Sequence, residues 1–348
     1  MAVIPASQAR AMFTQALVDV FKENIRPTGF LRSFFTEKVQ STRYLSIEVQ
    51  RGTEKVAVDV LRGTEGNRNN MSRSSQHIID PPYYREYFDA TELDVYDRMF
   101  GTDSIDAGVF AQFVQTVAEK LQMLTAKIER AYELQCATAL QTGIITVADG
   151  TMIDYKRKAD SLKDYTATPW TGAYDPYVQL ATGASFLRTV GKSEGGVVNL
   201  IMGSAAATAL INNATVKARG PLSNINFDTL RAPQRESVGG TTLGQITIGD
   251  YKANLWTYPE YYDNANGVST PYIDPKKVIM LPEQPHFTMG YALVPQLVDT
   301  EYPRPVVGKY VYGDYRDQRK HAHEYDVRSA GVAILTAVDQ VWTAQVVA

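Results

Sequence analysis

The sequence contains one cysteine and no long hydrophobic run. Cys136 excludes an intramolecular disulfide framework and is most simply a small buried apolar residue in a reducing compartment. No stretch of about 18 apolar residues occurs, which excludes a membrane-spanning helix. The N-terminus has no charged head followed by an apolar core of roughly 7 to 15 residues, so we expect no secretory signal.

An excess of positive charge is also missing. The 348 residues carry 35 Lys and Arg against 38 Asp and Glu, and the sequence pI is about 5.9. Proteins that grip duplex DNA normally need a basic excess, because their affinity comes from neutralising phosphates. Tyrosine, by contrast, occurs 21 times. Tyrosine is favoured at subunit contacts but also fills cores, so this count alone does not separate the two.

Motifs for catalysis or metal binding are weak. The Gly-Lys-Ser of residues 191–193 imitates the end of a phosphate-binding loop, but the earlier glycine that such a loop needs would fall at Phe186. His321 and His323 would share one face of a strand, with Glu324 beside them, yet no motif specifies a third ligand. A solvated histidine pair is the better interpretation. We expect no catalytic residue, no cofactor and no metal site.

One long amphipathic helix is the clearest positive feature. Residues 106–142 contain no proline and only one glycine, Gly108. Ser104 or Asp106 can cap the start, and Gly143 suits a left-handed end. About 35 residues at 1.5 Å each make a rod of roughly 50 Å, useful as a coiled-coil arm or as the spine of an extended subunit. The apolar stripe, spaced by three and four, comprises Phe110, Phe113, Val117, Leu121, Leu124, Ile128 and Ala131.

An aromatic cluster follows a short amphipathic segment near the N-terminus. Residues 11–21 have an apolar face, and Pro27 and Gly29 then interrupt the pattern. An exposed aromatic cluster so near a terminus needs a partner. The expected contacts with another subunit are Phe30, Phe34 and Phe35; the alternative is an arm that folds onto its own domain.

Residues 41–80 alternate like a β-hairpin. Apolar side chains recur over 44–49 and 56–61, with turn-favouring residues at 51–54 and a polar stretch at 63–76. A long charged hairpin cannot bury both faces by itself, so it implies docking on another surface. The charged candidates for that contact are Arg51, Glu54, Lys55 and Arg62.

Charge is distributed unevenly along the first third of the chain. Residues 1–85 carry 12 Lys and Arg against 8 Asp and Glu, whereas residues 86–103 carry 6 acidic residues and only Arg98. A basic arm and an acidic belt would suit head-to-tail pairing between subunits. They could equally be solvated charges, each exposed pair contributing about 0 to 1 kcal/mol. The acidic candidates are Glu86, Asp89, Glu92 and Asp94.

The rest of the chain alternates short strands and helices, which predicts an α+β fold. We expect a hairpin over 144–155 and two helices, over 176–190 and 204–212. The expected strands are 197–202, 242–248, 255–258, 277–281, 325–327 and 331–338.

Several segments together carry a family resemblance. The long helix is preceded by DPPYYREYFDATELDVYDRMFG and ends in IERAYELQCATALQTG. It is followed by ITVADGTMIDY, Trp170, DPYVQLATGASFL and VNLIMGSAAATALINN. An early segment, residues 30–40, reads FLRSFFTEKVQ, and a late one, residues 327–342, reads VRSAGVAILTAVDQVW. In this order and spacing, nearly the whole chain resembles the lambda-type major capsid proteins of tailed bacteriophages, the capsid protein E family.

The resemblance implies the Hong Kong 97-type capsid fold. Its parts would be an N-terminal arm (1–40), an extended β-hairpin loop (41–85), a peripheral domain (86–196) with a spine helix at about 106–142, an axial domain (197–305) and a return to the peripheral domain (306–348).

It also implies a structural protein that assembles with copies of itself. Hexamers and pentamers would close into an icosahedral head around double-stranded DNA, without sequence-specific DNA binding and without a membrane. A scaffolding protein, a portal and a decoration protein are the implied partners. The expected location is the virion, after assembly in the host cytoplasm.

Three further readings stay open. Some shells of this fold join subunits by a Lys-to-Asn isopeptide bond, for which Lys55 is a conceivable donor, although an ordinary edge-strand charge is the simpler reading. An encapsulin-like compartment shell would share the fold. A soluble oligomeric α+β enzyme, whose long helix forms a dimer, would predict a ligand pocket.

Overall fold

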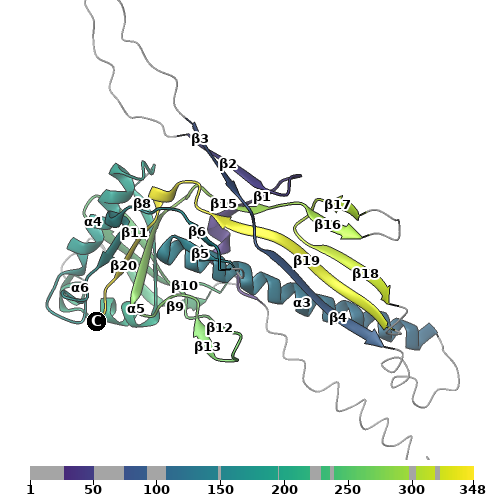
Figure 1. Cartoon of the computed structure of the whole chain (residues 1–348). Coiled ribbons are helices and arrows are strands. Elements are labelled where there is room, and N and C mark those ends of the chain that lie inside the picture. The colour runs from purple at the N-terminus through teal and green to yellow at the C-terminus, as the bar shows by residue number, and fades with distance from the viewer. Residues whose placement is uncertain are drawn as a thin grey trace, which may run out of the picture.

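The chain is organised around one long helix that two β-sheets flank. The computed structural model describes residues 27–50, 74–91, 107–147, 150–194, 196–219, 229–235, 239–297, 303–317 and 322–348. Figure 1 shows the helix, α3, running beside a long narrow sheet, with a second sheet and three shorter helices gathered at its C-terminal end.

Helix α3 (Ala107–Thr142) matches the predicted spine helix in both extent and ending. Gly143 has a φ of +77°, a left-handed conformation that residues with a Cβ rarely adopt. A Cβ at this glycine would also lie 2.5 Å from Cδ of Arg157. The predicted capping residues Ser104 and Asp106 lie outside the described residues.

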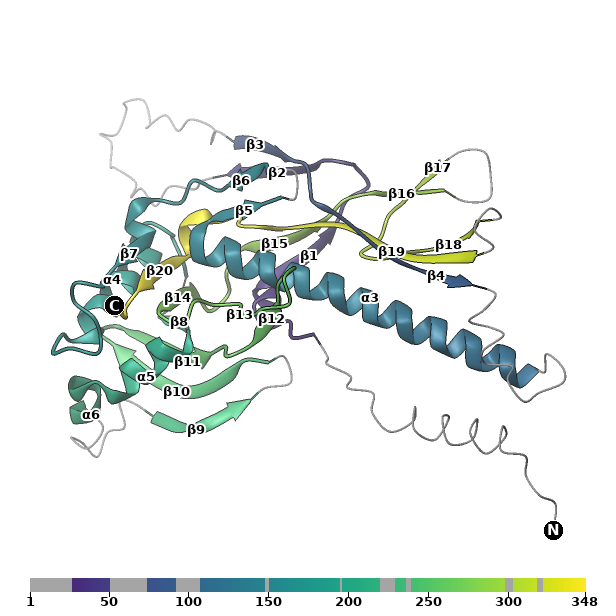
Figure 2. The same ribbon diagram turned by 60° about the horizontal axis from the view of Figure 1, so that its bottom comes forward.

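The central strand β19 (Ala322–Ile334) organises a five-stranded sheet along α3. Its first part pairs with β4 (Tyr83–Thr91) on one edge and with β18 (Val311–Asp317) on the other. Its last four residues pair with β15 (Phe287–Tyr291), which pairs in parallel with β1 (Phe35–Val39). Figure 2 shows α3 lying across one face of this sheet.

The prediction of two C-terminal strands, 325–327 and 331–338, is wrong in detail. Strand β19 is continuous and ends at Ile334. The expected break is absent because Arg328, Ser329 and Ala330 continue the ladder with β4. Residues Val338–Gln340 form a 3-10 turn, η3, instead of a strand.

A seven-stranded mixed sheet lies at the C-terminal end of α3. Its strands, in spatial order, are β7 (Leu162–Asp164), β20 (Trp342–Gln345), β14 (Lys277–Pro282), β8 (Val197–Met202), β11 (Tyr251–Thr257), β10 (Thr241–Ile248) and β9 (Thr229–Arg235). The accompanying helices are α4 (Pro176–Thr189), α5 (Ser204–Asn212) and α6 (Ala214–Arg219). These elements confirm the predicted helices 176–190 and 204–212 and the predicted strands 197–202, 242–248 and 277–281; the strand predicted at 255–258 corresponds to β11.

The seven-stranded sheet is apolar on both faces. Ile201 of β8 and Ile279 of β14 belong to a core shared with α3, whereas Leu200 and Val278 belong to a second core under α4 and α5. Successive side chains of a strand point to opposite faces. A continuous apolar run such as residues 197–202 therefore supplies apolar side chains to both cores.

Short two-stranded ribbons and single turns complete the described structure. The ribbons are β5 (Ile144–Thr146) with β6 (Met152–Asp154), β12 (Tyr261–Asp263) with β13 (Ser269–Pro271), and β16 (Val294–Leu297) with β17 (Pro303–Val306). The turns are η1 (Arg32–Phe34) and η2 (Ala159–Ser161). The β5–β6 ribbon confirms the hairpin predicted over 144–155.

The remaining ribbon lies at the predicted hairpin near residue 50. Strand β2 (Leu45–Gln50) forms as expected and pairs with β3 (Ser74–Ile79), whereas the second predicted strand, 56–61, lies outside the described residues. Leu45 lies opposite Ile79, and Gln50 lies opposite Ser74. The ribbon is therefore closed by a far longer connection, because the polar stretch 63–76 supplies part of the second strand. Residues 51–73 lie outside the described residues.

The two sheets do not follow the predicted segment boundaries. The seven-stranded sheet takes β7 from residues 86–196 and β20 from residues 306–348, in addition to strands from 197–305. The five-stranded sheet likewise takes β1 from the segment 1–40 and β15 from 197–305. The division into peripheral and axial domains stays a prediction.

Candidate functional site

The aromatic residues predicted as subunit contacts lie against this chain's own core. Phe30 and Phe35 are each 5% exposed, and Phe34 packs partly buried beside them. The Phe30 ring stacks on Tyr258 at a centroid distance of 5.4 Å, and Phe35 meets Phe287 at 5.2 Å. The expectation of an exposed cluster is wrong for Phe30 and Phe35, because β1 pairs with β15 and places Phe35 beside Phe287, whereas Phe30 packs on Trp256 and Tyr258.

A buried carboxylate ties the N-terminal segment to the spine helix. Glu133 of α3 accepts hydrogen bonds from the amides of Leu31 at 2.8 Å and Arg32 at 3.1 Å. The hydroxyl of Tyr258 donates to the same carboxylate at 2.9 Å, and Thr28 contacts that hydroxyl at 2.5 Å. Burial is the main reason that the pKa of Glu133 rises to about 6.

A partly buried arginine joins the C-terminal end of the spine helix to the seven-stranded sheet. Arg157 donates to the carbonyls of Leu140 at 2.7 Å and Val341 at 3.1 Å, and to the hydroxyl of Thr343 at 3.1 Å. Desolvation lowers its pKa to about 10. The guanidinium therefore satisfies carbonyls at the end of α3 and holds the helix against β20.

The base of the β2–β3 ribbon exposes apolar side chains. Ile78 is 69% exposed, and Val39 and Tyr44 are also exposed. Arg43 lies over the Tyr44 ring at 5.0 Å and pairs loosely with Asp80 at 3.7 Å. In Figure 1 the ribbon points away from the body of the subunit. The predicted contact residues of this hairpin, Arg51, Glu54, Lys55 and Arg62, lie outside the described residues.

Strand β4 presents two chemically different faces. Glu86 points toward α3, where its carboxylate pairs with Nζ of Lys127 at 2.7 Å. Tyr83, Tyr87 and Asp89 are exposed on the opposite face. Of the predicted acidic candidates, Asp89 is thus available on the surface, whereas Glu86 is already paired within the chain. Glu92 and Asp94 lie outside the described residues.

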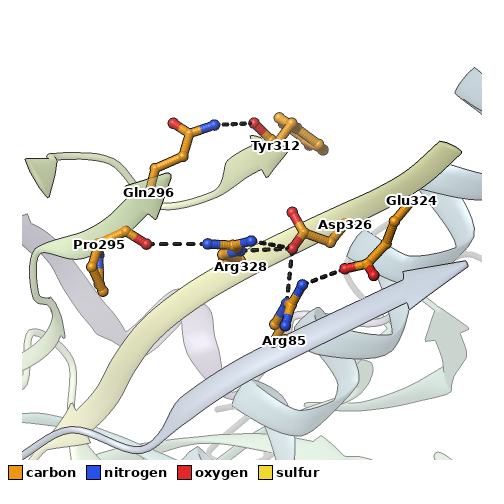
Figure 3. Close-up of polar contacts among 7 residues, drawn as sticks. All are labelled: Arg85, Pro295, Gln296, Tyr312, Glu324, Asp326 and Arg328. Carbon is orange, nitrogen blue, oxygen red and sulfur yellow. Dashed lines mark hydrogen bonds and ion pairs between the residues drawn. The ribbon is translucent and has the colours of Figure 1, made fainter. Parts of the chain in front are cut away.

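A buried ionic network lies on the face of the sheet that Tyr83 and Tyr87 share (Figure 3). Oδ2 of Asp326, a fully buried residue, accepts from Nε of Arg85 at 2.8 Å and from Nε and Nη2 of Arg328 at 2.7 and 2.5 Å. Arg85 also pairs with Glu324, and Arg328 donates to the carbonyl of Pro295 at 3.2 Å. The hydrogen bond to Asp326 raises the pKa of Arg85. One carboxylate therefore links β4, β19 and β16.

The network depends on a close approach opposite Asp326. Gly313 of β18 is the register partner of Asp326, and a Cβ at this glycine would lie 2.2 Å from Oδ1 of Asp326. It would also lie 2.6 Å from the ring of Tyr315, over which the Arg328 guanidinium sits at 4.9 Å. Only a glycine leaves room for the carboxylate and the ring together.

Features of a metal site or a membrane span do not appear in the part of the chain that the structure describes. Nδ1 of His323 lies 3.3 Å from a carboxylate oxygen of Asp314, and His321 is outside that part. Within the described ranges, no three His, Cys, Asp or Glu side chains gather closely enough to hold a metal ion. No described helix is both long and apolar enough to cross a membrane.

Sequence reasoning missed the polar groups that join the elements. Glu133 reads as one more polar position of an amphipathic helix, and Asp326 and Arg328 read as alternating strand residues. Arg85 is separated from Asp326 by 241 positions in sequence. A buried carboxylate needs hydrogen-bond donors around it, but the sequence does not show that these carboxylates are buried.

The arrangement defines a class of structural subunit with the Hong Kong 97-type capsid fold. The chain is similar over its full length to a solved prophage capsid protein from E. coli CFT073, with a TM-score of 0.62, 12% identity and complete coverage of both chains. It is also similar to the capsid of the cyanophage P-SCSP1u, with a TM-score of 0.50, 8% identity and coverage of 99% and 92%. The predicted fold is confirmed.

A third solved structure, the SrpI encapsulin from Synechococcus elongatus PCC 7942, gives a TM-score of 0.48 at 10% identity, with coverage of 99% and 96%. No curated protein sequence matches this chain significantly.

The family follows from the sequence profile. The model described as "Phage major capsid protein E" matches residues 13–345. The chain therefore belongs to the phage major capsid protein E family. Members are structural proteins that assemble into the capsid shell of the virion and are not enzymes. This confirms the predicted function and sets aside the reading as a soluble oligomeric enzyme.

Proposed function

We propose that this subunit forms hexamers and pentamers that close into an icosahedral head around double-stranded DNA. Family membership and the shape of the subunit support this. The observation that carries it is the β2–β3 ribbon, which extends from the body and exposes Ile78 and Tyr44 at its base. A two-stranded ribbon is marginally stable by itself in water. Docking on a neighbouring subunit would supply the missing burial.

The proposal includes the partners that the family resemblance implies. Assembly takes place in the host cytoplasm with a separate scaffolding protein, a portal occupies one vertex, and the three-fold sites can bind a decoration protein. The near balance of 35 basic and 38 acidic residues suits a wall past which packed DNA slides. Several modest contacts per subunit, each made at once in a closed shell, give high overall stability through effective concentration.

The predicted contact residues are kept as candidates unless this chain already buries or pairs them. Asp89 is exposed on β4 and is a contact candidate, together with Arg51, Glu54, Lys55, Arg62, Glu92 and Asp94 from the sequence. Phe30 and Phe35 are omitted because this chain already buries them. Phe34 and Glu86 are weaker candidates for the same reason.

The test is assembly of ribbon variants, followed by negative-stain electron microscopy and size-exclusion chromatography. Ile78→Glu, and separately Ala at Arg51, Glu54 and Lys55 together, should leave the subunit folded but lower shell formation at least tenfold, since each 1.4 kcal/mol of contact is about a factor of ten. Val268→Glu is the matched control, because Val268 is an exposed apolar residue beside the β12–β13 ribbon. Normal assembly of both ribbon variants would rule out the ribbon as a principal contact.

A further inference from the structure

Every group that donates a hydrogen bond to Glu133 is neutral. The donors are two backbone amides and one tyrosine hydroxyl. The nearest candidate cation, the guanidinium of Arg32, lies instead 3.6 Å from the carboxylate of Glu129, one turn earlier in α3. Among the described residues, no basic side chain forms an ion pair with Glu133. A fully buried carboxylate without a cationic partner is costly to keep ionised.

The groups that face Glu133 do not change charge near neutral pH. They are Arg32 on the N-terminal segment, Cys136 on the same helix, and Tyr258 and Tyr272 from the region beyond β11. Burial raises the pKa of the Cys136 thiol and of both tyrosine hydroxyls, and neighbouring acidic groups raise the pKa of Arg32 against its desolvation. Glu133 is thus the carboxyl at this junction whose pKa burial moves toward neutral pH.

Proton linkage gives the direction in which pH changes the stability of the closed junction around Glu133. Burial raises the pKa of Glu133 from 4.5 to about 6, and its three hydrogen bonds together with the charge of Arg32 only partly oppose this rise. The closed junction therefore binds a proton more tightly than an open, hydrated Glu133 would. Stabilisation of the closed form is fully present below pH 4.5 and is lost as the pH rises through about 6.

We propose that Glu133 is a proton-linked clamp that holds the N-terminal segment, Thr28 to Phe35, on the spine helix. Protonation tightens the clamp, and ionisation loosens it. The geometry supports this because Glu133 is the single side chain that joins the segment, α3 and Tyr258. Opening would be a local unfolding step that exposes Glu133 to water while both sheets persist. The clamp concerns the individual subunit and does not depend on shell assembly.

Hydrogen exchange of the full chain, kept unassembled, tests the clamp. The amides of Leu31 and Arg32 are the reporters because they donate directly to Glu133. After correction for the intrinsic exchange rates, their opening equilibrium constants should be roughly tenfold larger at pH 7.5 than at pH 5. Amides of β8, in the seven-stranded sheet, should show no comparable change and serve as an internal reference.

Three variants make the test decisive. Glu133→Gln keeps an acceptor but cannot titrate, so it should abolish the pH dependence. Tyr258→Phe removes one donor to the carboxylate and should move the transition to higher pH. Glu129→Gln is the matched control, a carboxyl on the same helix beside Arg32 that should leave the dependence unchanged. The proposal would be wrong if the opening constants of the Leu31 and Arg32 amides did not depend on pH in the wild type, or if Glu133→Gln left that dependence unchanged.

Discussion

The two halves of the spine helix differ in how they are held. In the C-terminal half, Ile128, Tyr132, Cys136 and Leu140 are fully buried between the two sheets. From Thr116 to Lys127, the helix is covered on one side only, by β4, β19 and β18, and Met123 is 59% exposed. The same helical period thus serves two environments, a core and a supported surface. The exposed half is the part of the spine on which assembly contacts remain possible.

The sheet beside the exposed half carries a polar network in addition to its apolar packing. Its network centres on Asp326, whereas the joint at the other end combines Arg157 with the large apolar core. A polar network is sensitive to the loss of a single partner, because the remaining charges lose their compensation. An apolar core loses stability more gradually as side chains are shortened.

Asp326→Ala should have the largest effect on this comparison. Removal of the shared carboxylate leaves Arg85 and Arg328 without their common partner, which should cost about 3 to 5 kcal/mol. The measurement is urea unfolding of the unassembled subunit. Asp314→Ala, an exposed carboxylate on β18, is the control and should cost less than about 1 kcal/mol. Equal losses for the two variants would show that the buried network does not stabilise this region.

Leu140→Ala and Met123→Ala compare the two halves of the helix directly. Leu140 is fully buried, so its truncation should cost about 2 to 5 kcal/mol. Met123 is exposed, and its truncation should change stability by less than about 0.5 kcal/mol in the unassembled subunit. A comparable cost at both positions, measured by the same urea titration, would remove the distinction. A cost at Met123 that appears only in assembled shells would locate a subunit contact there.

Lys127→Ala should have the smallest effect. Its ion pair with Glu86 joins α3 to β4 at 2.7 Å, but Lys127 is exposed, so the loss should be about 0 to 1 kcal/mol at low salt and less at high salt. Lys163→Ala, which breaks the exposed pair with Asp160 far from this region, is the control. A salt-independent loss above about 2 kcal/mol would mean that this contact is central to the supported half of the helix.

Local patterns located the spine helix, α4, α5 and strands such as β8, β10 and β14, but not β4, β15, β18 or β20. The helix over 107–142 carries a clear period and strand β8 a continuous apolar run, and Gly143 terminates the helix in the left-handed conformation that its lack of a Cβ permits. The same kind of reasoning did not find β3 as a partner of β2. The polar residues 74–76 do not alternate like a strand in the sequence, yet they pair with β2, because pairing of strands depends on contacts across the fold.

The outcome for the expected surface exposure has a related reason. Phe30 and Phe35 were expected to be exposed because sequence alone cannot show what covers a segment near a terminus. Strand β15 covers Phe35 by pairing with β1 across about 250 positions of the chain, and Tyr258 stacks on Phe30. Asp89, on the outer face of β4, is exposed as the prediction required.

By itself, the sequence determined the spine helix, the alternating α+β elements and, through the order of its segments, the capsid family. These depend on side-chain periodicity, which neighbouring residues impose on each other. Only the tertiary structure decided the pairing of β2 with β3, the burial of the N-terminal aromatic rings, and the roles of Glu133 and Asp326. The physical reason is that strand pairing, burial and charge compensation depend on groups distant in sequence, such as Leu31 with Glu133 and Arg85 with Asp326, which only the folded chain brings together.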